Sequence, residues 1–392
     1  MTILRGRNFL MTPGPSSVPE RVLQAMNRNA VDLGEPGYVA MMRQCLEDLR
    51  ALFRTQSQVF AYIANGHGAW EAALANVIGP GERVLVPVTG HFGQNWAMMA
   101  QALGAEVDLI PNDWRSAVDP QQVEQRLRAD SAARIKAVLL VHTDTATGIS
   151  NDVAAVRAAI DAAGHPALFM VDAVASLGTA DFRMDEWRVD VTVAASQKGL
   201  MTPPGLGFTA AGPRALEAAR AGGAARNYWD WSLRAKDEWY RWFCGTSPEH
   251  LMFALREAID MINEEGLEQV FARHRRLAEA TRAAVACWAA GGKLELNARD
   301  ARTASDSVTT IRVAEGIDAR TIKSTCHERF NVSLGGGLGQ LDGKAFRIGH
   351  MGDINEATVL GALGCVEATL RLLEIPYRSG LDAAVAALSE AG

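Results

Sequence analysis

The stretch VFAYIANGHGAWEAALANVI (59–78) contains three parts in a fixed order. An apolar run comes first, the turn NGHG follows, and a helix-like pattern completes it. The same order returns further along the chain, beginning at the apolar runs RVLVPV (83–88), IKAVLLVH (135–142), ALFMVD (167–172) and VDVTVAA (189–195). Repeated strand, turn and helix are typical of an α/β fold with a mostly parallel sheet covered on both faces. Continuous apolar strands indicate burial on both sides.

The pattern changes near residue 263. Residues 266–290 have the periodicity of one long amphipathic helix, and shorter runs such as VTTIRV (308–313) and AFRIGH (345–350) follow. We therefore expect a large cofactor-binding domain and a smaller C-terminal α+β domain, joined by a helical stretch near 248–265. The predicted boundaries are an N-terminal arm over 1–20, a large domain over 21–262 and a small domain over 263–392.

Composition excludes several classes of protein. Of the 392 residues, 48% are hydrophobic and 21% charged, which is typical of a soluble globular protein. The net charge is −6, and the densest basic run, residues 273–276, is interpreted as a solvated helix face, so no nucleic-acid partner is expected. No apolar run reaches the ~18 residues of a membrane span.

The cysteines and histidines argue against metal sites and disulfides. Five scattered cysteines form no C-x-x-C pair, and the eight histidines show no H-E-x-x-H spacing. No metal is therefore expected. A reducing compartment fits this cysteine usage, and the N-terminus lacks the apolar core of a signal peptide, so the expected location is cytoplasmic.

Ligands of open α/β sheets bind beyond the carboxyl ends of the strands. The turn NGHG places two glycines at the start of a helix, where backbone N–H groups and the helix dipole suit a phosphate, although such a turn is often only a turn. No G-x-G-x-x-G motif follows a strand, which disfavours a dinucleotide fold. The residues expected at this edge are Asn65, Gly66, His67, Gly68, His91, Phe92, Thr145, Asp172, Gln197 and Lys198.

Two of these residues, an acid and a lysine, suggest how a cofactor could be bound. Asp172 ends an apolar strand, so it either caps a helix or pairs with a buried cation. Lys198 stands between an apolar strand and the uncharged segment GLMTPPGLGF; it is either a solvated charge or a desolvated amine, whose lowered pKa favours the nucleophilic form. A phosphate site, a strand-end acid and a buried lysine together match pyridoxal 5′-phosphate.

Several motifs carry a family resemblance across nearly the whole chain. They are TPGPSSVP (12–19), GHGAWEAAL (66–74), HTDTATG (142–148), VDAVASLG (171–178), SQKGLMTPPG (196–205) and GKAFRIGHMG (343–352). In this order they resemble the alanine/serine–glyoxylate aminotransferases, a class V branch of the fold-type I pyridoxal-phosphate enzymes.

The resemblance implies a role for each cofactor-binding residue. Lys198 would bind the cofactor covalently and move the proton, and Asp172 would pair with the pyridinium nitrogen. Phe92 would stack on the ring, and Val174 would pack under it. The residues implied on the phosphate side are Gly66, His67, Gly68 and Gln197.

The resemblance also implies how the substrate is bound. Arg347 would bind its carboxylate as a bidentate partner, with Gly14 and Thr145 also in contact, Thr145 near the ring oxygen. In FCGTSP (243–248), Thr246 would reach the phosphate of the neighbouring subunit, so a homodimer with shared active sites is implied.

The implied activity is a ping-pong transamination to glyoxylate, with serine or alanine as the default amino donor. Aspartate, a ureidoglycine-like amine or pyridoxamine as donor, and pyruvate as acceptor, remain alternatives. A pyridoxamine–pyruvate aminotransferase would need an acid where His67 stands and an added basic residue near GGGLG (335–339), and both are absent. A cysteine desulfurase would need a cysteine in the glycine loop 335–339, and a non-catalytic relative would lack Lys198, Asp172 or Arg347.

The sequence departs from the family pattern at three places. Many relatives have HRSP and an aromatic residue where DLGEPGY (32–38) stands here, and often tyrosine where Phe243 stands. The segment NYWDWSLRAKDEWYRWF (227–243) is rich in tryptophan and tyrosine. It is either interface and packing structure or a wall that shapes an unusual donor site.

Overall fold

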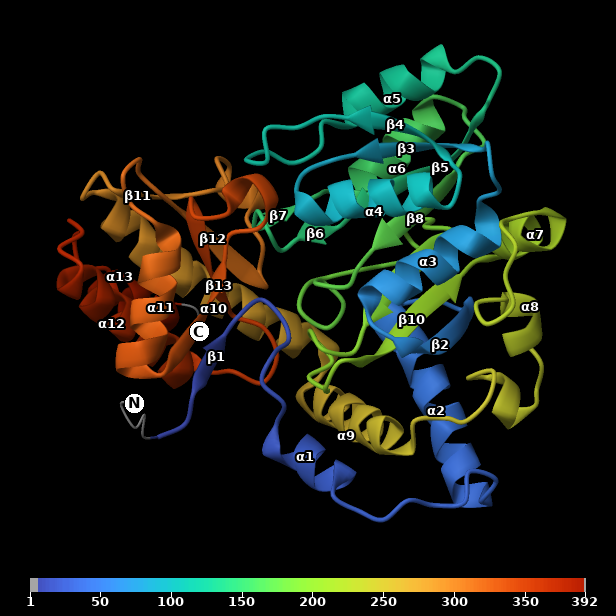
Figure 1. Cartoon of the computed structure of the whole chain (residues 1–392), viewed down its shortest axis with the longest axis horizontal. Helices are drawn as coiled ribbons and strands as arrows, with labels where there is room; N and C mark the ends of the chain where they lie inside the picture. Colours follow the sequence, from blue (N-terminus) through green and yellow to red (C-terminus); the bar gives the residue numbers. More distant parts are fainter. Residues whose placement is uncertain (1–5, 391–392) are drawn as a thin grey trace.

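The computed structural model describes residues 6–390 as a large and a small α/β body side by side (Figure 1). The large body contains a seven-stranded sheet of order β2-β10-β9-β8-β5-β3-β4. The neighbouring strands β9, β8, β5, β3 and β4 all run parallel to one another. Strand β10 is antiparallel to both of its neighbours, β2 and β9. The strands are β2 (Gln58–Ala64), β3 (Arg83–Pro87), β4 (Glu106–Ile110), β5 (Ile135–Val141), β8 (Leu168–Asp172), β9 (Val191–Ala195) and β10 (Gly205–Ala211).

The predicted mostly parallel α/β sheet is confirmed, and two of its strands were not predicted. Strand β4 alternates apolar and acidic residues at an edge, so it lacks a continuous apolar run. Strand β10 is rich in glycine and alanine, which have low strand propensity, yet it pairs along its full length with β2. In both β4 and β10, tertiary packing outweighs the local sequence preference.

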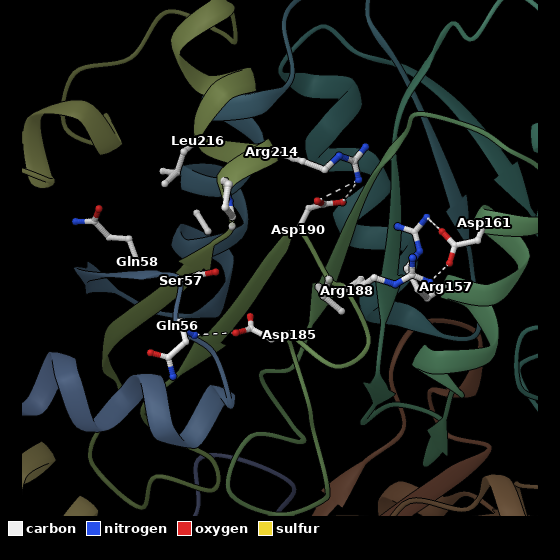
Figure 2. Close-up of a pocket in the computed structure, with 14 residues that line it drawn as sticks. Gln56, Ser57, Gln58, Arg157, Asp161, Asp185, Arg188, Asp190, Arg214 and Leu216 are labelled. Atoms are coloured by element: carbon white, nitrogen blue, oxygen red, sulfur yellow. Dashed lines mark hydrogen bonds and ion pairs between the residues drawn. The ribbon is translucent and has the colours of Figure 1, made fainter.

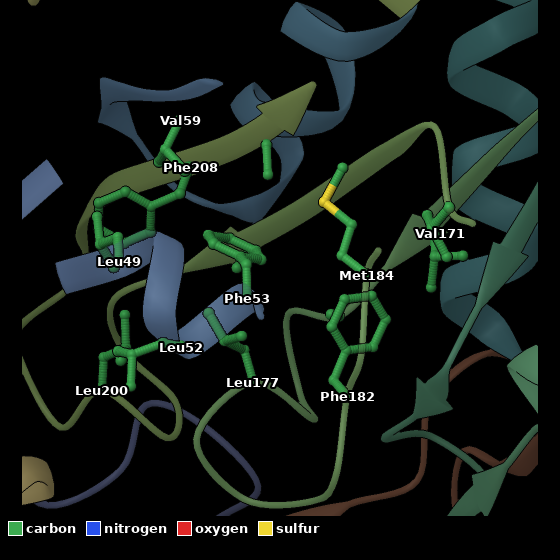
Figure 3. Packing of buried hydrophobic residues seen from close by; sticks show 14 of the residues in the cluster. Leu49, Leu52, Phe53, Val59, Val171, Leu177, Phe182, Met184, Leu200 and Phe208 are labelled. Atoms are coloured by element: carbon green, nitrogen blue, oxygen red, sulfur yellow. The ribbon is translucent and has the colours of Figure 1, made fainter. Parts of the chain in front are cut away.

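Helices cover both faces of the large sheet because successive strand residues point to opposite sides. Phe169 and Val171 of β8 pack on one face, and Leu168 and Met170 on the other. Figure 3 shows part of the first cluster, where Leu200, just after Lys198, packs near Leu177. The helices of the first face are α2 (Pro36–Phe53), α5 (Pro120–Ala129), α6 (Val153–Ala162) and α9 (Glu249–Glu265); those of the second are α3 (Gly66–Val77), α4 (His91–Ala102) and α7 (Pro213–Ala221).

The small body has a five-stranded sheet of order β1-β13-β14-β12-β11. Its first strand comes from the N-terminal arm, because Phe9 to Met11 pair in parallel with β13. Its strands are β1 (Phe9–Met11), β11 (Leu294–Leu296), β12 (Val308–Val313), β13 (Val332–Gly336) and β14 (Ala345–Gly349), and its helices are α10 (Leu267–Ala289), α11 (Ala319–Phe330), α12 (Glu356–Leu372) and α13 (Leu381–Glu390).

Shorter elements complete the chain. Helix α9 continues past residue 262, and Gly266, with a φ of 86°, separates it from α10. The remaining elements are α1 (Glu20–Met26), the hairpin of β6 (Thr143–Asp144) and β7 (Ile149–Ser150), α8 (Trp231–Arg234), and the 3-10 turns Trp239–Arg241, Ala301–Thr303 and Gly339–Leu341.

The basic run 273–276 is not simply a solvated face, and for His274 that prediction was wrong. His274 is buried against the loop between β14 and α12. Its Nε2 accepts a hydrogen bond from Gly352 N at 3.0 Å, and its Nδ1 donates to Val270 O at 2.7 Å. Burial holds its pKa well below the usual value, at about 4, so the ring is neutral. The arginines beside it remain at the surface in ion pairs.

Across residues 6–390, no helix is long and apolar enough to cross a membrane. In the same range, no group of three or more histidine, cysteine, aspartate or glutamate side chains is arranged to hold a metal ion. All five cysteines are free thiols.

Candidate active site

Residues from distant parts of the chain meet in one cavity of about 210 Å³ at the carboxyl ends of β5, β8 and β9. The predicted convergence of strand ends on one crevice is therefore observed. The predicted residues that line the cavity are Gly14, Asn65, Gly66, His67, Phe92, Thr145, Asp172, Val174, Gln197 and Lys198, joined by Pro15, Trp70, Thr143, Ala175 and Pro204. Gly68, His91, Thr246 and Arg347 belong to the predicted set but are not part of this wall.

Lys198 lies in the turn directly after β9, and its side chain points into a dry environment. The residue is only 9% exposed, and its Nζ donates a hydrogen bond to Pro13 O. Burial, and after it the positive charge of Arg347, lower the pKa of Lys198 to about 8. Near neutral pH a larger fraction of this amine is unprotonated than in a solvated lysine, and the unprotonated form attacks carbonyl carbon.

The N-terminal arm holds the lysine turn in place. Ser16 N donates to Gln197 O at 3.0 Å, and Ser16 Oγ donates to Lys198 O at 2.8 Å. Gly14 has a φ of 111°, and a Cβ at this position would overlap Nζ and Cε of Lys198. Glycine is therefore required here for both conformation and space. The residue predicted to contact substrate lies directly against the amine.

Asp172, the last residue of β8, presents a buried carboxylate to the same cavity. Its Oδ1 accepts a hydrogen bond from Val174 N at 2.6 Å within a turn, and no helix begins there, so the helix-cap alternative is excluded. Burial raises the pKa of Asp172 to about 7, and the negative charge of Asp144 acts in the same direction. A cation placed beside this carboxylate would favour its ionised form.

The cavity has aromatic and aliphatic walls suited to a planar ring. Phe92, in the first turn of α4, lies with its ring centroid 6.3 Å from that of Trp70. Val174 packs against Gly66, where a Cβ would lie 3.0 Å from Val174 Cγ2. Trp70 was not predicted as a site residue, although it stands one helical turn after Gly66 on α3, a spacing that places both on one face.

The start of α3 is already capped by a side chain. Asn65 Oδ1 accepts hydrogen bonds from His67 N at 3.0 Å and Gly68 N at 3.2 Å. An anion at this helix start would therefore compete with Asn65 for two of the predicted backbone donors. Gly68 instead allows close packing, because a Cβ there would approach Ala64 Cβ at 2.6 Å. On the lysine side, Gln197 Oε1 is buried without a hydrogen-bond partner in residues 6–390.

Arg347 stands on β14 of the small body and reaches across to the large one. Its Nη1 donates to Thr145 O at 2.9 Å, and its Nε donates to Gly336 O at 2.7 Å. Burial lowers the pKa of Arg347 to about 10, so it remains a cation at neutral pH. Thr246, in contrast, is exposed and does not line the cavity of its own chain.

The departures at 32–38 and at Phe243 have structural explanations. Glu35 caps α2 by accepting from Gly37 N at 3.1 Å and Tyr38 N at 2.9 Å, so its carboxylate is engaged. The buried Tyr38 hydroxyl forms a 2.8 Å hydrogen bond with Ser247 Oγ, beside Thr246. Phe243 is buried in the core.

The aromatic segment 227–243 is in part packing structure. Trp231 Nε1 donates to Tyr62 Oη at 2.8 Å, and the Trp231 ring stacks on Phe60 with centroids 5.4 Å apart. Tyr228 and Tyr240 of the same segment are exposed on this chain. The packing interpretation therefore accounts for Trp231, and the exposed tyrosines are available to a neighbouring molecule.

A second and larger cavity, of about 670 Å³, lies near the starts of β2 and β9, away from the strand ends that carry Lys198 (Figure 2). Its charged groups are engaged: Arg157 and Arg188 pair with Asp161, and Arg214 pairs with Asp190. Asp185 accepts hydrogen bonds from Thr55 Oγ1 and Gln56 N. None of its lining residues is a lysine, histidine or cysteine. Size alone does not make this cavity a site, so the smaller cavity is the candidate.

Residues 8–340 match the family model of aminotransferase class-V. The chain belongs to the class-V aminotransferases. It is 42% identical to the serine–glyoxylate aminotransferase of Methylorubrum extorquens, over 98% of this chain and 97% of that protein. It is 39% identical to the L-aspartate–glyoxylate aminotransferase of Paracoccus denitrificans, over 98% and 96%.

Among solved structures, the ureidoglycine–glyoxylate aminotransferase of Bacillus subtilis superposes with a TM-score of 0.89 at 30% identity, over 99% of this chain and 100% of that one. This neighbour confirms the fold-type I architecture, and the predicted family resemblance is confirmed as well. The protein is a transaminase, and its family implies pyridoxal 5′-phosphate as cofactor. The buried amine and the buried carboxylate in the same cavity fit the aldehyde and the ring nitrogen of such a group.

The contact between Gly14 and Lys198 generates a prediction. Replacing Gly14 with alanine forces a Cβ into the space of Nζ, so covalent capture of pyridoxal 5′-phosphate, followed by visible absorbance, should fall at least about ten-fold. Gly316→Ala is the matched control, because Gly316 also has a positive φ, 86°, but no atom within 4 Å of a Cβ. In both variants the free energy of unfolding should fall by roughly 1 kcal/mol, because alanine disfavours a positive φ. Equal capture by the two variants would contradict this placement of the amine.

Proposed function

We propose that this protein transfers the amino group of a small amino acid, serine first and alanine next, to glyoxylate in a pyridoxal 5′-phosphate-dependent, ping-pong reaction. The observation that carries the proposal is the buried Lys198 amine, with a pKa of about 8, in one small cavity with the Asp172 carboxylate. Relatives named for glyoxylate as amino acceptor, at 42% and 39% identity over nearly the whole chain, support the acceptor.

In this proposal the cofactor ring, when bound, stores the electron pair left on the substrate α-carbon after proton removal. The protein supplies the groups around it. Lys198 would hold the cofactor covalently and, once freed by the incoming amino acid, would carry the α-proton from one carbon to the other. Asp172 would be ionised beside the protonated ring nitrogen and would keep that nitrogen charged. Phe92 and Val174 would provide apolar surfaces for the ring.

Arg347 is proposed to bind the substrate carboxylate. Its bonds to Thr145 O and Gly336 O fix the guanidinium plane through Nε and Nη1, so Nη2 is not used by either bond. A planar guanidinium suits a carboxylate better than a lysine would. Serine and alanine are placed first because the chain is 42% identical to a serine–glyoxylate aminotransferase over nearly its whole length.

Aspartate, a ureidoglycine-like amine and pyridoxamine remain alternative donors, and pyruvate an alternative acceptor. The aspartate alternative is supported by the 39% identity to an aspartate–glyoxylate enzyme. Pyridoxamine is disfavoured because His67 stands where an acid is expected to bind that amine; partial desolvation, and after it the nearby His91, lower the pKa of His67, so the ring is neutral near pH 7. A non-catalytic role does not explain why Lys198, Asp172 and Arg347 occur together.

A panel of amino donors tests the substrate assignment. Purified holoenzyme is mixed with serine, alanine, aspartate or pyridoxamine, and loss of the visible absorbance of the bound aldehyde form reports each half-reaction. Serine should convert the cofactor fastest, and glyoxylate should restore the band faster than pyruvate. The Lys198→Ala variant is the control and should lose turnover by a factor of about 10⁴ or more. Conversion by none of the donors would refute the aminotransferase assignment for this substrate class.

We also propose a homodimer in which Thr246 of one subunit contacts the cofactor phosphate of the other. Thr246 is exposed on its own chain, and Ile63, Tyr228 and Tyr240 are exposed large side chains that a partner would cover. His67, at the mouth of the cavity, is exposed as well. Tyr38, through its hydrogen bond to Ser247, fixes the loop that carries Thr246.

Subunit mixing tests this arrangement. Thr246→Asp places a negative charge where a phosphate is expected, so it should abolish most activity through repulsion, as Lys198→Ala does through loss of the amine. In a dimer of the two variants, one site would combine an intact Lys198 with an intact partner Thr246. Co-refolding the two should therefore restore activity that neither variant has alone. Absence of restoration in a verified mixed dimer would refute the shared site.

A further inference from the structure

A second buried carboxylate, Asp144, lies next to the candidate active site and has no part in the reaction proposed above. It ends the short strand β6 and is fully buried. Sequence reasoning did not single it out, because HTDTATG offers no local pattern that distinguishes it from a turn residue. Its hydrogen bonds connect segments that are far apart in the chain.

Asp144 caps helix α4 from another element. The residue at the N-cap position of α4, Gly90, has no side chain, so the first N–H groups of the helix need an acceptor from elsewhere. Asp144 Oδ2 accepts from Phe92 N at 2.8 Å and from Gly93 N at 3.2 Å. A Cβ at Gly90 would overlap the Asp144 carboxylate, so the two residues fit only as this pair.

The other oxygen of Asp144 fixes the turn that follows it. Oδ1 accepts from Ala146 N at 3.0 Å, which holds the backbone around Thr145. Thr145 lines the cavity, and its carbonyl oxygen accepts the 2.9 Å hydrogen bond from Arg347 Nη1. One carboxylate therefore sets the position of Phe92 on one side and of the Thr145–Arg347 contact on the other.

The chemistry of this position requires a carboxylate. Three N–H donors approach both oxygens, and an asparagine amide could not serve them all because its nitrogen is itself a donor. Asp144 forms no ion pair within residues 6–390. Burial raises its pKa, and the hydrogen bonds from Ala146, Gly93 and Phe92 act against this rise. Burying the carboxylate charge costs desolvation free energy. The three backbone N–H donors and the positive end of the α4 dipole offset that cost.

We propose that Asp144 is a positioning residue. It holds Phe92, Thr145 and Arg347 in the positions that the cofactor and the substrate carboxylate require. This inference rests on the proposed function for its catalytic consequence. Its structural part, the anchoring of α4 and the 144–147 turn, is independent of which amine is the donor.

The experiment compares Asp144→Asn and Asp144→Ala with a matched control, Asp152→Ala. Asp152 caps α6 by accepting from Ala155 N at 2.8 Å, but it is exposed and does not line the cavity. Three quantities are measured: hydrogen exchange of the first turn of α4 in the apo protein, the induced visible circular dichroism of bound pyridoxal 5′-phosphate, and kcat and KM.

Asp144→Ala should increase exchange in the first turn of α4 and reduce the induced dichroism. Its kcat/KM should fall on the order of ten- to a hundred-fold, through a higher KM for the amino acid as well as a lower kcat. Asp144→Asn, which keeps the volume and one acceptor, should lie between wild type and Asp144→Ala. Asp152→Ala should increase exchange only at the start of α6 and leave the dichroism and kcat/KM unchanged.

Unchanged exchange at α4 together with unchanged dichroism in Asp144→Asn would overturn the inference, even if Asp144→Ala does not fold. A purely structural role would lower stability and leave dichroism and KM at their wild-type values, and this result would also overturn it. If the wild-type enzyme transaminates no donor, the proposed function fails, whereas exchange and dichroism still decide the role of Asp144.

Discussion

The site depends on one physical constraint: an amine is buried where little water can solvate its charge. Lys198 is enclosed by the backbone of Gly14 and by the Pro13 carbonyl, and its nearest compensating carboxylates are themselves buried. Burial shifts the pKa values of Lys198 and Asp172 toward each other, to about 8 and about 7. Lys198 can therefore change its protonation state near neutral pH, as a group that transfers a proton at carbon must, whereas Asp172 would be ionised once a cation lies beside it.

The N-terminal arm links this constraint to the rest of the molecule. Residues 9–11 form the edge strand of the small sheet, and a few residues later Ser16 binds the backbone of the lysine turn in the large body. Arg347 crosses in the other direction, from β14 of the small sheet to Thr145. Two separate connections thus link the small body to the turn of Lys198 and to Thr145, both of which line the cavity, so a displacement of either body would change their positions. Figure 1 shows the two bodies side by side.

The sequence predicts the parts of the site that follow strands and misses those that depend on contacts across the fold. Lys198, Asp172 and Phe92 were predictable because apolar runs end near them and carboxyl ends of parallel strands meet. The contact of Gly14 with Lys198, the cap that Asp144 provides for α4 and the pairing of β1 with β13 join residues distant in sequence, so no local pattern indicates them. Burial of His274 was missed because arginines surround it in the chain.

The most direct test of the account is the site of covalent attachment. The holoenzyme is reduced with borohydride, digested and mapped by mass spectrometry. The account predicts that the cofactor is found on the peptide that contains Lys198 and on no other lysine, and that the Asp172→Asn variant is labelled at the same residue. Attachment at another lysine, or a cofactor that binds without any covalent bond to the protein, would contradict it.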